Sequence, residues 1–271
     1  SKLLMIHDSP DNKPVMLPEA AGAALHAQNP VVILFLILSI PLLITEWIIG
    51  KFNPMAKEIS SLRIVQAVFR FILWISGVKL TVIGEENVPT DVPVLYIGNH
   101  RSFFDVPITY PRCPIRTGYI AKKEMEKVPL LSTWMKRLHC LFLDRNDLKQ
   151  GLKTILTAIE KVKSGISICI FPEGTRNKNE DELDMLPFHE GSFKIAAKTN
   201  CPIIPMAISG SADIWENHFP RVKKTHVILE YGTPIYIDQL EKEDKKHLGA
   251  YTQNIIHEML VKNKAQYKPM Q

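Results

Sequence analysis

From about residue 80 onward, short apolar runs alternate with helical patterns, and this alternation restricts the fold more than any other feature of the chain. Seven runs rich in Ile, Val and Leu are predicted as strands: Leu80–Ile83, Val92–Ile97, Cys140–Leu143, Ile166–Phe171, Ile203–Ile208, Val227–Tyr231 and Pro234–Ile237. Helical patterns are predicted at Lys123–Leu138, Leu148–Lys163, Ser192–Lys198 and Glu241–Lys262. Strands that alternate with helices predict an α/β layered domain, in which helices flank a mostly parallel or mixed central sheet.

The most apolar stretch lies nearer the N-terminus, at residues 31–50. About twenty apolar residues are enough for a helix to cross the roughly 30 Å hydrocarbon core of a bilayer. Pro41 is tolerated in such a helix as a kink, and Glu46 lies near its end, where a carboxylate is less unfavourable than at the centre. Trp47 is typical of the membrane–water interface. The alternative is a buried helix of a soluble core. The flanking residues do not resemble those of a cleavable signal peptide.

Residues 63–79 form a second helical pattern of a different kind. Its apolar residues recur at helical spacing: Ile64, Ala67, Val68, Phe71, Ile72 and Ile75. Four polar residues interrupt it: Arg63, Gln66, Arg70 and Lys79. This pattern predicts a basic amphipathic helix that lies in the membrane interface. A two-helix hairpin that dips into one leaflet fits the two segments equally well.

Basic residues are more frequent after the apolar run than before it. Lys51, Lys57, Arg63 and Arg70 follow the run, whereas Lys2 and Lys13 precede it. The positive-inside rule therefore places the rest of the chain on the cytoplasmic side of a membrane. We expect three parts: an N-terminal tail at residues 1–30, membrane-associated helices at 31–79, and the α/β domain at 80–271.

The charge and the cysteines exclude two classes of protein. Lys and Arg exceed Asp and Glu by 33 to 28, a net charge of +5 that suits anionic ligands or surfaces but is too small to predict nucleic-acid binding. The four cysteines are scattered, without the short paired spacing of a zinc site or a disulfide framework. Reduced thiols in a cytosol-facing domain are the simpler interpretation.

His100 and Asp105 lie just past the strand predicted at Val92–Ile97. We expect Ser102 to cap a short helix over Phe103–Ile108, so that Asp105 reaches back to the imidazole of His100. A carboxylate on one ring nitrogen selects the tautomer and stabilises the imidazolium formed when the other nitrogen takes a proton. The pair is a protease-like triad without its serine, and the substrate would supply the hydroxyl. Taken alone, the spacing is also that of a polar loop residue and a helix acid.

The segment Phe171–Arg176 follows the strand predicted at Ile166–Phe171. Pro172 ends that strand because it has no N–H for the ladder, and Gly174 lets the backbone approach a ligand closely. Arg176 presents a planar guanidinium that suits a phosphate, and Glu173 can orient it or accept a bond from a substrate hydroxyl. Taken alone, the segment is also compatible with a polar turn that carries a surface ion pair.

Further basic side chains follow other apolar runs. Lys122 and Lys123 follow an apolar triplet, and Arg145 ends the run after Cys140. Three basic clusters can converge on one anion, although solvated charges are the more common role for lysines. The remaining histidines considered have no comparable partners, and we expect structural or surface roles for His139, His189, His218, His226 and His257.

Together these residues resemble the lysophosphatidic acid acyltransferases, a family of glycerolipid acyltransferases with four ordered motifs. Asn99, His100 and Asp105 match the first motif, Asn-His-x4-Asp, and Arg145 matches the arginine that ends the second. Phe171–Arg176 reproduces the third motif in full. Pro202–Pro205 fits the fourth, an apolar segment with prolines, although Met206 stands where a valine is more usual. The resemblance covers residues 80–237, and the family commonly carries the Lys-Lys-Glu run seen at Lys122–Glu124.

The resemblance implies transfer of a fatty acyl group from acyl-CoA or acyl carrier protein to the 2-hydroxyl of 1-acyl-glycerol-3-phosphate, which gives phosphatidic acid. His100 would be the general base and Asp105 would orient it. The acceptor's phosphate would be held by the remaining matched residues: Arg176, Arg145, Lys122 or Lys123, and the Glu173, Gly174 and Thr175 turn. No metal or prosthetic group is expected, because the thioester is already activated. The expected partners are the bilayer, lysophosphatidic acid and the acyl donor, and not nucleic acid.

Two alternatives use the same scaffold. One is an acyltransferase for glycerol-3-phosphate or another lysophospholipid. The other is a membrane lipid-binding protein without turnover, against which the intact His100 and Asp105 pair argues.

Overall fold

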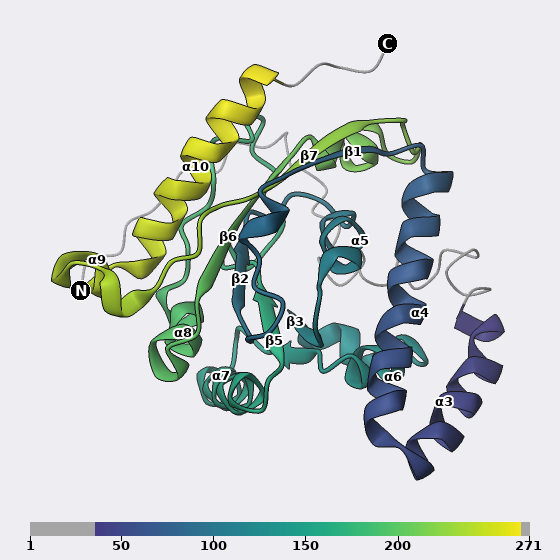
Figure 1. Cartoon of the computed structure of the whole chain (residues 1–271). Helices are drawn as coiled ribbons and strands as arrows, with labels where there is room; N and C mark the ends of the chain where they lie inside the picture. The colour runs from purple at the N-terminus through teal and green to yellow at the C-terminus, as the bar shows by residue number, and fades with distance from the viewer. Residues whose placement is uncertain (1–35, 267–271) are drawn as a thin grey trace, which may run out of the picture.

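The computed structural model describes residues 36–266, and a seven-stranded sheet forms its centre (Figure 1). The strands are β1 (Lys79–Ile83), β2 (Leu95–Gly98), β3 (Thr117–Lys122), β4 (Leu141–Leu143), β5 (Ser167–Ile170), β6 (Ile203–Ser209) and β7 (His226–Tyr231). Their order across the sheet is β1-β7-β6-β2-β5-β3-β4. Neighbouring strands are parallel except β6 and β7, which are antiparallel. The expected α/β class with a mostly parallel, mixed sheet is confirmed.

Helices cover both faces of this sheet (Figure 1). They are α3 (Ile40–Phe52), α4 (Pro54–Ile75), α5 (Asp105–Thr109), α6 (Leu131–Arg137), α7 (Leu148–Lys163), α8 (Lys194–Thr199), α9 (Lys242–Lys246) and α10 (Leu248–Gln266). On one face, α7, α8 and α10 bury the first of two large hydrophobic clusters. On the other, α4 and α5 bury the second. A layered α/β domain results, with its core divided by the sheet.

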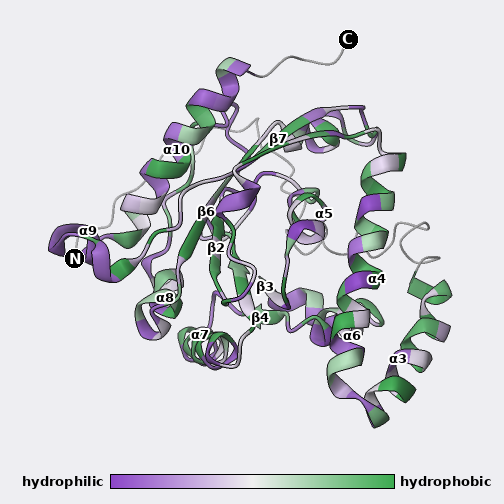
Figure 2. Cartoon of the chain, viewed as in Figure 1, coloured by the Kyte–Doolittle hydropathy of each residue, from purple (hydrophilic) through white to green (hydrophobic). Residues whose placement is uncertain are grey.

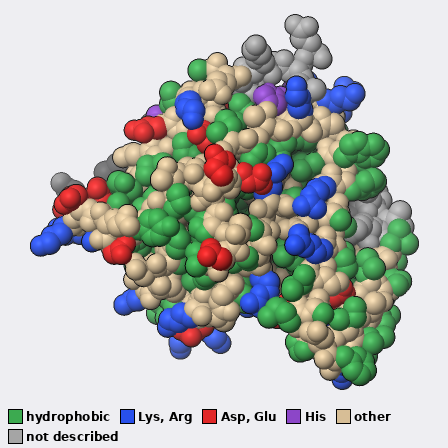
Figure 3. Space-filling model, viewed as in Figure 1, with side chains coloured by type: hydrophobic (Ala, Val, Ile, Leu, Met, Phe, Trp, Pro, Cys, Tyr) green, Lys and Arg blue, Asp and Glu red, His purple; other side chains and the backbone are tan. Residues whose placement is uncertain are grey.

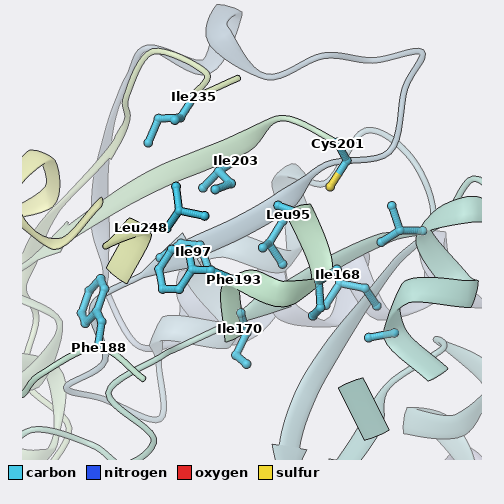
Figure 4. Packing of buried hydrophobic residues seen from close by; sticks show 14 of the residues in the cluster. Leu95, Ile97, Ile168, Ile170, Phe188, Phe193, Cys201, Ile203, Ile235 and Leu248 are labelled. Carbon is cyan, nitrogen blue, oxygen red and sulfur yellow. The ribbon is translucent and has the colours of Figure 1, made fainter. Parts of the chain in front are cut away.

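Successive residues of the central strands contribute to opposite clusters, as the two-residue period of a strand requires. Leu95 and Ile97 of β2 belong to the cluster under α7, α8 and α10, while Tyr96 between them belongs to the other. Figure 4 shows Leu95 and Ile97 packed near Ile168, Phe193 and Ile203. Both faces of the sheet are therefore apolar, which explains why its strands appear in the sequence as nearly continuous apolar runs.

Helix α7 coincides with the predicted segment. Asp147 caps it, with one carboxylate oxygen that accepts the backbone N–H groups of Lys149 and Gln150. Its buried residues recur three or four positions apart: Thr154, Ile155, Ala158, Ile159 and Val162.

One predicted strand is wrong and one strand was missed. Pro234–Ile237 is not a strand, because Ile235 alone makes an isolated bridge with Ile203 and a 3-10 turn begins at Ile237. The strand that was missed is β3, whose sequence TGYIAK is less apolar than the other central strands. β3 needs glycine at position 118, because a Cβ there would lie 2.2 Å from the carbonyl oxygen of His139.

Two predicted helices are divided, and the short one after His100 starts later than expected. Lys123–Leu138 contains a 3-10 turn at Lys123–Lys127 and then α6, with Pro129 between them. Glu241–Lys262 consists of α9 and α10, which meet at His247. Helix α5 begins at Asp105 rather than at Phe103, because Ser102 and the residues before it form the turn that surrounds the Asp105 carboxylate.

Helices α3 and α4 form an antiparallel pair whose inner side belongs to the protein core. Leu62 and Leu73 of α4 pack in the second cluster. Gln66 of α4 is buried and donates to the Tyr110 and Cys113 carbonyls, and Arg70 donates to the Pro111 carbonyl. Two of the four polar residues in the predicted amphipathic pattern therefore face the protein.

The outer side of the same pair is apolar and exposed. The large hydrophobic residues exposed on α3 and α4 are Ile40, Leu42, Ile44, Trp47, Ile48, Phe52, Met55, Ile59, Phe71, Trp74 and Ile75. Figure 2 shows the hydrophobic colour concentrated on α3. Glu46, the carboxylate inside the apolar run, is buried and accepts the hydroxyls of Ser60 and Ser61 in α4. Within residues 36–266, none of the helices combines the length and the apolar content that crossing a bilayer needs. Residues 31–35 of the predicted membrane run, and the tail at residues 1–30, lie outside the described residues.

Candidate active site

The sheet brings the two motif segments together, because β2 and β5 are neighbouring parallel strands that end at the same edge. His100 follows β2 and the Phe171–Arg176 turn follows β5. Asn99 links the end of β2 to β6, since its side-chain amide donates to the Ile208 carbonyl and accepts the Ile208 N–H. Sites in α/β sheets form at the carboxyl ends of strands, where loops diverge.

The imidazole of His100 and the carboxylate of Asp105 form a close pair. His100 Nδ1 lies 2.7 Å from Asp105 Oδ2, and Asp105 is fully buried while the His100 side chain keeps 21% of its exposure. The same Oδ2 accepts the backbone N–H groups of Arg101 and Ser102 at 2.8 Å. These donors hold the Asp105 carboxylate in place. The carboxylate in turn favours the His100 tautomer with a proton on Nδ1, which leaves Nε2 free to exchange a proton.

The third-motif turn packs directly on this histidine. The ring of Phe171 stacks on that of His100 with centroids 4.4 Å apart and planes 14° apart. Asn177, just past the turn, donates its N–H to the His100 carbonyl at 2.7 Å. The ring of His100 is thus restrained by Asp105 at its edge and by Phe171 on its face.

Glu173 connects the two motifs through backbone groups. One of its carboxylate oxygens accepts the His100 N–H at 2.8 Å, and the other accepts the Leu186 N–H at 2.9 Å. The side chain is buried, and burial raises the pKa of its carboxyl, an effect that these two N–H bonds oppose. Because both oxygens are engaged by backbone N–H groups, this geometry suits a positioning role better than the phosphate contact expected from the sequence.

Gly174 forms the close turn that was expected. Its φ is +77°, in the left-handed region that favours glycine. A Cβ at this position would lie 3.1 Å from His189 Nε2 and 3.7 Å from Arg145 Cζ. The second-motif arginine is therefore brought to the third-motif turn, as predicted. His189, for which we expected a structural or surface role, lies against the same glycine.

These residues line an open cavity of about 440 Å³. Its polar lining includes Arg145, His189 and Lys194, and its apolar lining includes Leu148 and Leu152 of α7. Phe171, which stacks on His100, belongs to the same wall. Asp144 and Asp147 also line the cavity, so its rim carries both signs of charge. Arg145 and Lys194 can bind an anionic group there, and the apolar wall suits a hydrocarbon part.

Arg176 lies on the other side of the turn, against the first motif. Its guanidinium carbon lies 3.5 Å from the centroid of the Phe103 ring, a cation–π contact. Its NH1 lies 3.3 Å from Glu216 Oε1. Arg176 is thus fixed close to the loop that carries His100.

Glu216 is the residue that sequence reasoning missed most clearly. Its carboxylate accepts the Ser102 hydroxyl at 2.7 Å and the Phe103 N–H at 2.8 Å, besides its contact with Arg176. Burial raises the pKa of this carboxyl, an effect that the two donors oppose. Forty residues separate it from Arg176, in a 3-10 turn without a recognisable motif, so nothing local in the sequence points to it.

The remaining predicted residues reach the same edge of the sheet. Lys122 ends β3 and pairs in register with Leu143 of β4, two residues before Arg145. Lys123 begins the 3-10 turn that follows β3. Thr175 is half-buried between Gly174 and Arg176. Among residues 36–266, His, Cys, Asp and Glu side chains are not grouped so as to hold a metal ion.

The arrangement combines a base with anion-binding groups. His100 can take a proton from a hydroxyl and stabilise the resulting charge through Asp105. Arg145 and Arg176 lie on the two sides of the turn that packs on His100. A molecule that carries both an alcohol and a phosphate can contact the imidazole and the guanidinium groups together.

Comparison with known proteins gives a consistent result. Residues 79–209 match the family model described as Acyltransferase. The chain is 33% identical over 179 residues to a 1-acyl-sn-glycerol-3-phosphate acyltransferase of Cocos nucifera, an alignment that covers 66% of this chain and 56% of the relative. It is 30% identical over 201 residues to the enzyme of the same name from Limnanthes douglasii, with 73% and 68% covered. For the Saccharomyces cerevisiae enzyme of that name, identity is 29%, with 68% and 59% covered.

The chain therefore spans between 56% and 68% of the length of these three relatives. A crystal structure of the 1-acyl-sn-glycerophosphate (LPA) acyltransferase PlsC from Thermotoga maritima superimposes with a TM-score of 0.73. The match covers 92% of this chain and 98% of that one, at 22% sequence identity. At that identity the likeness shows a shared fold.

Proposed function

This chain belongs to the 1-acyl-sn-glycerol-3-phosphate acyltransferase family, and we propose that it transfers a fatty acyl group to the 2-hydroxyl of 1-acyl-sn-glycerol-3-phosphate to give phosphatidic acid. The acyl donor is a thioester, either acyl-CoA or acyl carrier protein. The names of the relatives support the acceptor, and the geometry of this chain supports the chemistry.

The observation that carries the proposal is the 2.7 Å bond between His100 Nδ1 and the buried Asp105 carboxylate. With Nδ1 occupied, Nε2 is the nitrogen that removes the proton of the acceptor's 2-hydroxyl. The oxygen attacks the thioester carbonyl, and the new ester forms as the C–S bond breaks. The proton held on His100 then passes to the thiolate that leaves. Asp105 stabilises the imidazolium between these steps.

The acceptor's phosphate is bound by basic residues around the Gly174 turn. Arg145 and Arg176 provide planar guanidinium groups on two sides of the turn, and Lys122 and Lys123 add positive charge from the end of β3. Gly174 and Thr175 let the backbone approach the phosphate. Glu173 contributes by holding the His100 backbone. The group that reacts with the hydroxyl is thereby placed at a fixed position relative to the headgroup.

The α3–α4 pair is the membrane-associated part of the protein in this proposal. Its outer side exposes Trp47, Phe52, Phe71 and Trp74, while its inner side is part of the core. A helix pair with one buried side and one exposed apolar side fits a hairpin that enters one leaflet, where the lipid substrate lies. The basic residues that follow the apolar run support a cytoplasmic position for the catalytic domain.

The test is a transfer assay with the full chain in lipid, using lysophosphatidic acid and labelled acyl-CoA or acyl carrier protein. His100→Ala should lower kcat by about 10²–10⁴-fold, the usual contribution of a general base. His257→Ala, on the exposed side of α10, is the matched control and should leave kcat unchanged. Undiminished transfer by His100→Ala would remove the proposed base.

Arg176→Ala tests the phosphate assignment separately. It should raise the KM for lysophosphatidic acid while leaving the KM for the acyl donor nearly unchanged. Arg112→Ala is the control, because Arg112 pairs with Glu85 away from the site. If only the KM for the acyl donor changed, Arg176 would not bind the acceptor's phosphate. Absence of transfer by the wild type to any lysolipid or to glycerol-3-phosphate would favour a lipid-binding protein without turnover.

A further inference from the structure

A six-residue segment between Glu216 and β7 combines exposed apolar and basic side chains. We call Phe219–Lys224 (sequence FPRVKK) the basic-apolar loop. All six residues are exposed, and Phe219 and Val222 keep 57% and 52% of their accessible surface. The loop contains three positive charges and no negative one. Within the part of the chain that the structure describes, none of the three basic side chains forms an ion pair. Most of its apolar and basic surface therefore faces solvent.

Contacts at both ends of the loop hold it in a defined position. The ring of Phe219 packs edge-on against Trp215, with centroids 5.2 Å apart. The Arg221 N–H donates to the His218 carbonyl, and the Lys223 N–H donates to the Ile214 carbonyl at 2.8 Å. The exposed side chains are therefore presented by a backbone that the protein itself supports.

The loop is joined to the candidate active site through aromatic contacts. Trp215 lies between Phe219 and Phe103, with ring centroids 5.6 Å from the Phe103 ring. The guanidinium of Arg176 sits on the same Phe103 ring. The loop thus lies at the edge of the sheet where we place the acceptor's phosphate.

The loop is also joined to the C-terminal end of α4. Lys79, the first residue of β1, donates its N–H to the Thr225 carbonyl directly after the loop. A Cβ on Gly77 would lie 2.6 Å from Lys224 Cγ, so the stem of this lysine covers the turn after α4. Figure 1 shows the start of β7 beside this end of α4. Phe71, Trp74 and Ile75 are exposed there. In Figure 3, apolar side chains gather over this end of α4, with Lys and Arg side chains beside them.

We propose that the basic-apolar loop is a second membrane contact, which binds a bilayer surface that carries anionic headgroups. Phe219 and Val222 insert among the lipid chains near the interface, and Arg221, Lys223 and Lys224 bind the phosphate groups of anionic lipids. Apolar insertion and a cluster of basic residues are the two signals that together give stable attachment at a membrane surface. The contact deepens the proposed function and rests on it, because it places the phosphate site at headgroup level beside the α3–α4 pair.

The experiment is vesicle flotation of the full chain, without any acyl donor, on phosphatidylcholine alone and on phosphatidylcholine with phosphatidylglycerol. Wild type should bind the anionic vesicles more tightly. The triple variant Arg221→Gln, Lys223→Gln, Lys224→Gln should lose about fivefold in affinity per charge removed on anionic vesicles, and little on neutral ones. Phe219→Ala with Val222→Ala should weaken binding to both.

The matched control removes three other lysines, by Lys242→Gln, Lys245→Gln and Lys246→Gln in α9, which lies across the molecule from α4 (Figure 1). It changes the net charge equally and should bind anionic vesicles like the wild type. A loop variant that binds anionic vesicles like the wild type would overturn the proposal. So would equal weakening by the α9 variant, which would show that only net charge matters.

A second measurement separates the loop from the exposed face of α3 and α4. Val222→Cys labelled with an environment-sensitive fluorophore should shift to the blue on anionic vesicles and be quenched by lipids labelled in the upper acyl chain. An unshifted label on a protein that floats would show that the loop stays in water, and would overturn the proposal. If the basic residues of the loop affected binding of acyl carrier protein but not of vesicles, the partner would be a protein, which also contradicts it.

Failure of the proposed function is distinguishable from failure of this contact. Flotation and fluorescence need no turnover, so a protein that bound anionic vesicles through the loop without transferring acyl groups would contradict the reaction alone. Conversely, the wild type could transfer acyl groups while the loop variants bind vesicles as tightly as the wild type. That result would contradict only the proposed membrane contact of the loop.

Discussion

At the scale of single residues, the site depends on carboxylates that are buried but well bonded. Asp105 is fully buried and accepts three donors on one oxygen, the imidazole of His100 and two backbone N–H groups. Glu173 accepts two backbone N–H groups. A buried carboxylate without such donors would be strongly unfavourable. Apart from the Leu186 N–H, these donors all belong to the segment that carries His100. The bonds that satisfy the buried carboxylates therefore also hold this segment in position.

Glu216→Ala tests whether this carboxylate positions Arg176 and the first motif. The change leaves the Phe103 N–H without its acceptor and removes the partner of Arg176. We expect the KM for lysophosphatidic acid to rise by roughly 10- to 150-fold, with a smaller fall in kcat, because hydrogen bonds to charged groups contribute about 1.5–3 kcal/mol. Steady-state kinetics with the acceptor and the donor varied in turn measure both quantities.

A conservative replacement distinguishes positioning from simple loss of structure. Glu216→Gln keeps an oxygen for the Phe103 N–H and should recover most of the acceptor affinity. Glu258→Ala, an exposed change on α10, serves as the control and should match the wild type. If the Glu216→Ala variant had the same KM for lysophosphatidic acid as the wild type, Arg176 would need no partner at this position.

At the scale of elements, local sequence decides a helix where capping and periodicity agree. Helix α7 was predicted with its observed bounds from its helical pattern, and the structure adds that Asp147 caps it. Strand β3 was missed, because its interior contains Gly118 and its ends are Thr117 and Lys122. Its pairing with β4 and β5 supplies what its own composition lacks.

Asp147→Ala should destabilise the protein by about 1 kcal/mol, within a range of roughly 0.5–2 kcal/mol, because two backbone N–H groups lose their acceptor. Urea unfolding followed by circular dichroism measures the free energy of unfolding. Asp147→Asn keeps a side-chain oxygen for the cap and should recover most of the loss. If the free energy of unfolding were unchanged in Asp147→Ala, packing of the apolar face alone would maintain the first turn of α7.

At the scale of the whole molecule, the α3–α4 pair and the sheet share one core. Leu62 and Leu73 pack with residues of β2 and β6, and Gln66 bonds to carbonyls near α5. The predicted boundary between membrane-associated helices and the α/β domain, at residues 79 and 80, therefore coincides with a packed interface. An apolar outer face held on a packed core can present the active site at a fixed height above a membrane.

The stability of the whole chain should depend on pH through Glu182, a half-buried carboxylate with a raised pKa. Burial raises the pKa of Glu182, whose carboxylate accepts the Gly210 N–H. Between its ordinary and raised pKa, the folded state binds a proton that the unfolded state does not. This group therefore lowers the free energy of unfolding as the pH rises through that window.

Glu182→Gln removes this titration and keeps an oxygen for the Gly210 N–H. The free energy of unfolding of the variant, minus that of the wild type, should increase as the pH rises from below the ordinary glutamate pKa to neutrality. Urea unfolding of both proteins at a series of pH values measures this difference directly. Glu160→Gln, an exposed change on α7, is the control. A difference that stays constant with pH would contradict a raised pKa at Glu182.

The sequence by itself determined the α/β class, the ends of most strands, α7, and the residues of the His100 and Phe171–Arg176 segments. Each of these depends on neighbours within a few positions: the two-residue period of a strand, the 3.6-residue period of a helix, a cap, a proline or a glycine. The meeting of His100 with the Gly174 turn was also predictable in outline, because parallel strands end at a common edge.

Only the tertiary structure decided the order of the strands, the inward orientation of Gln66, and the places of His189 and Glu216 beside Gly174 and Arg176. These features depend on partners tens of residues away in the chain. Which distant groups meet is set by how the two apolar faces of the sheet are covered, and a local pattern carries no information about that choice. The His100 and Asp105 pair can therefore be recognised in the sequence, whereas the residues that hold Arg176 in place cannot.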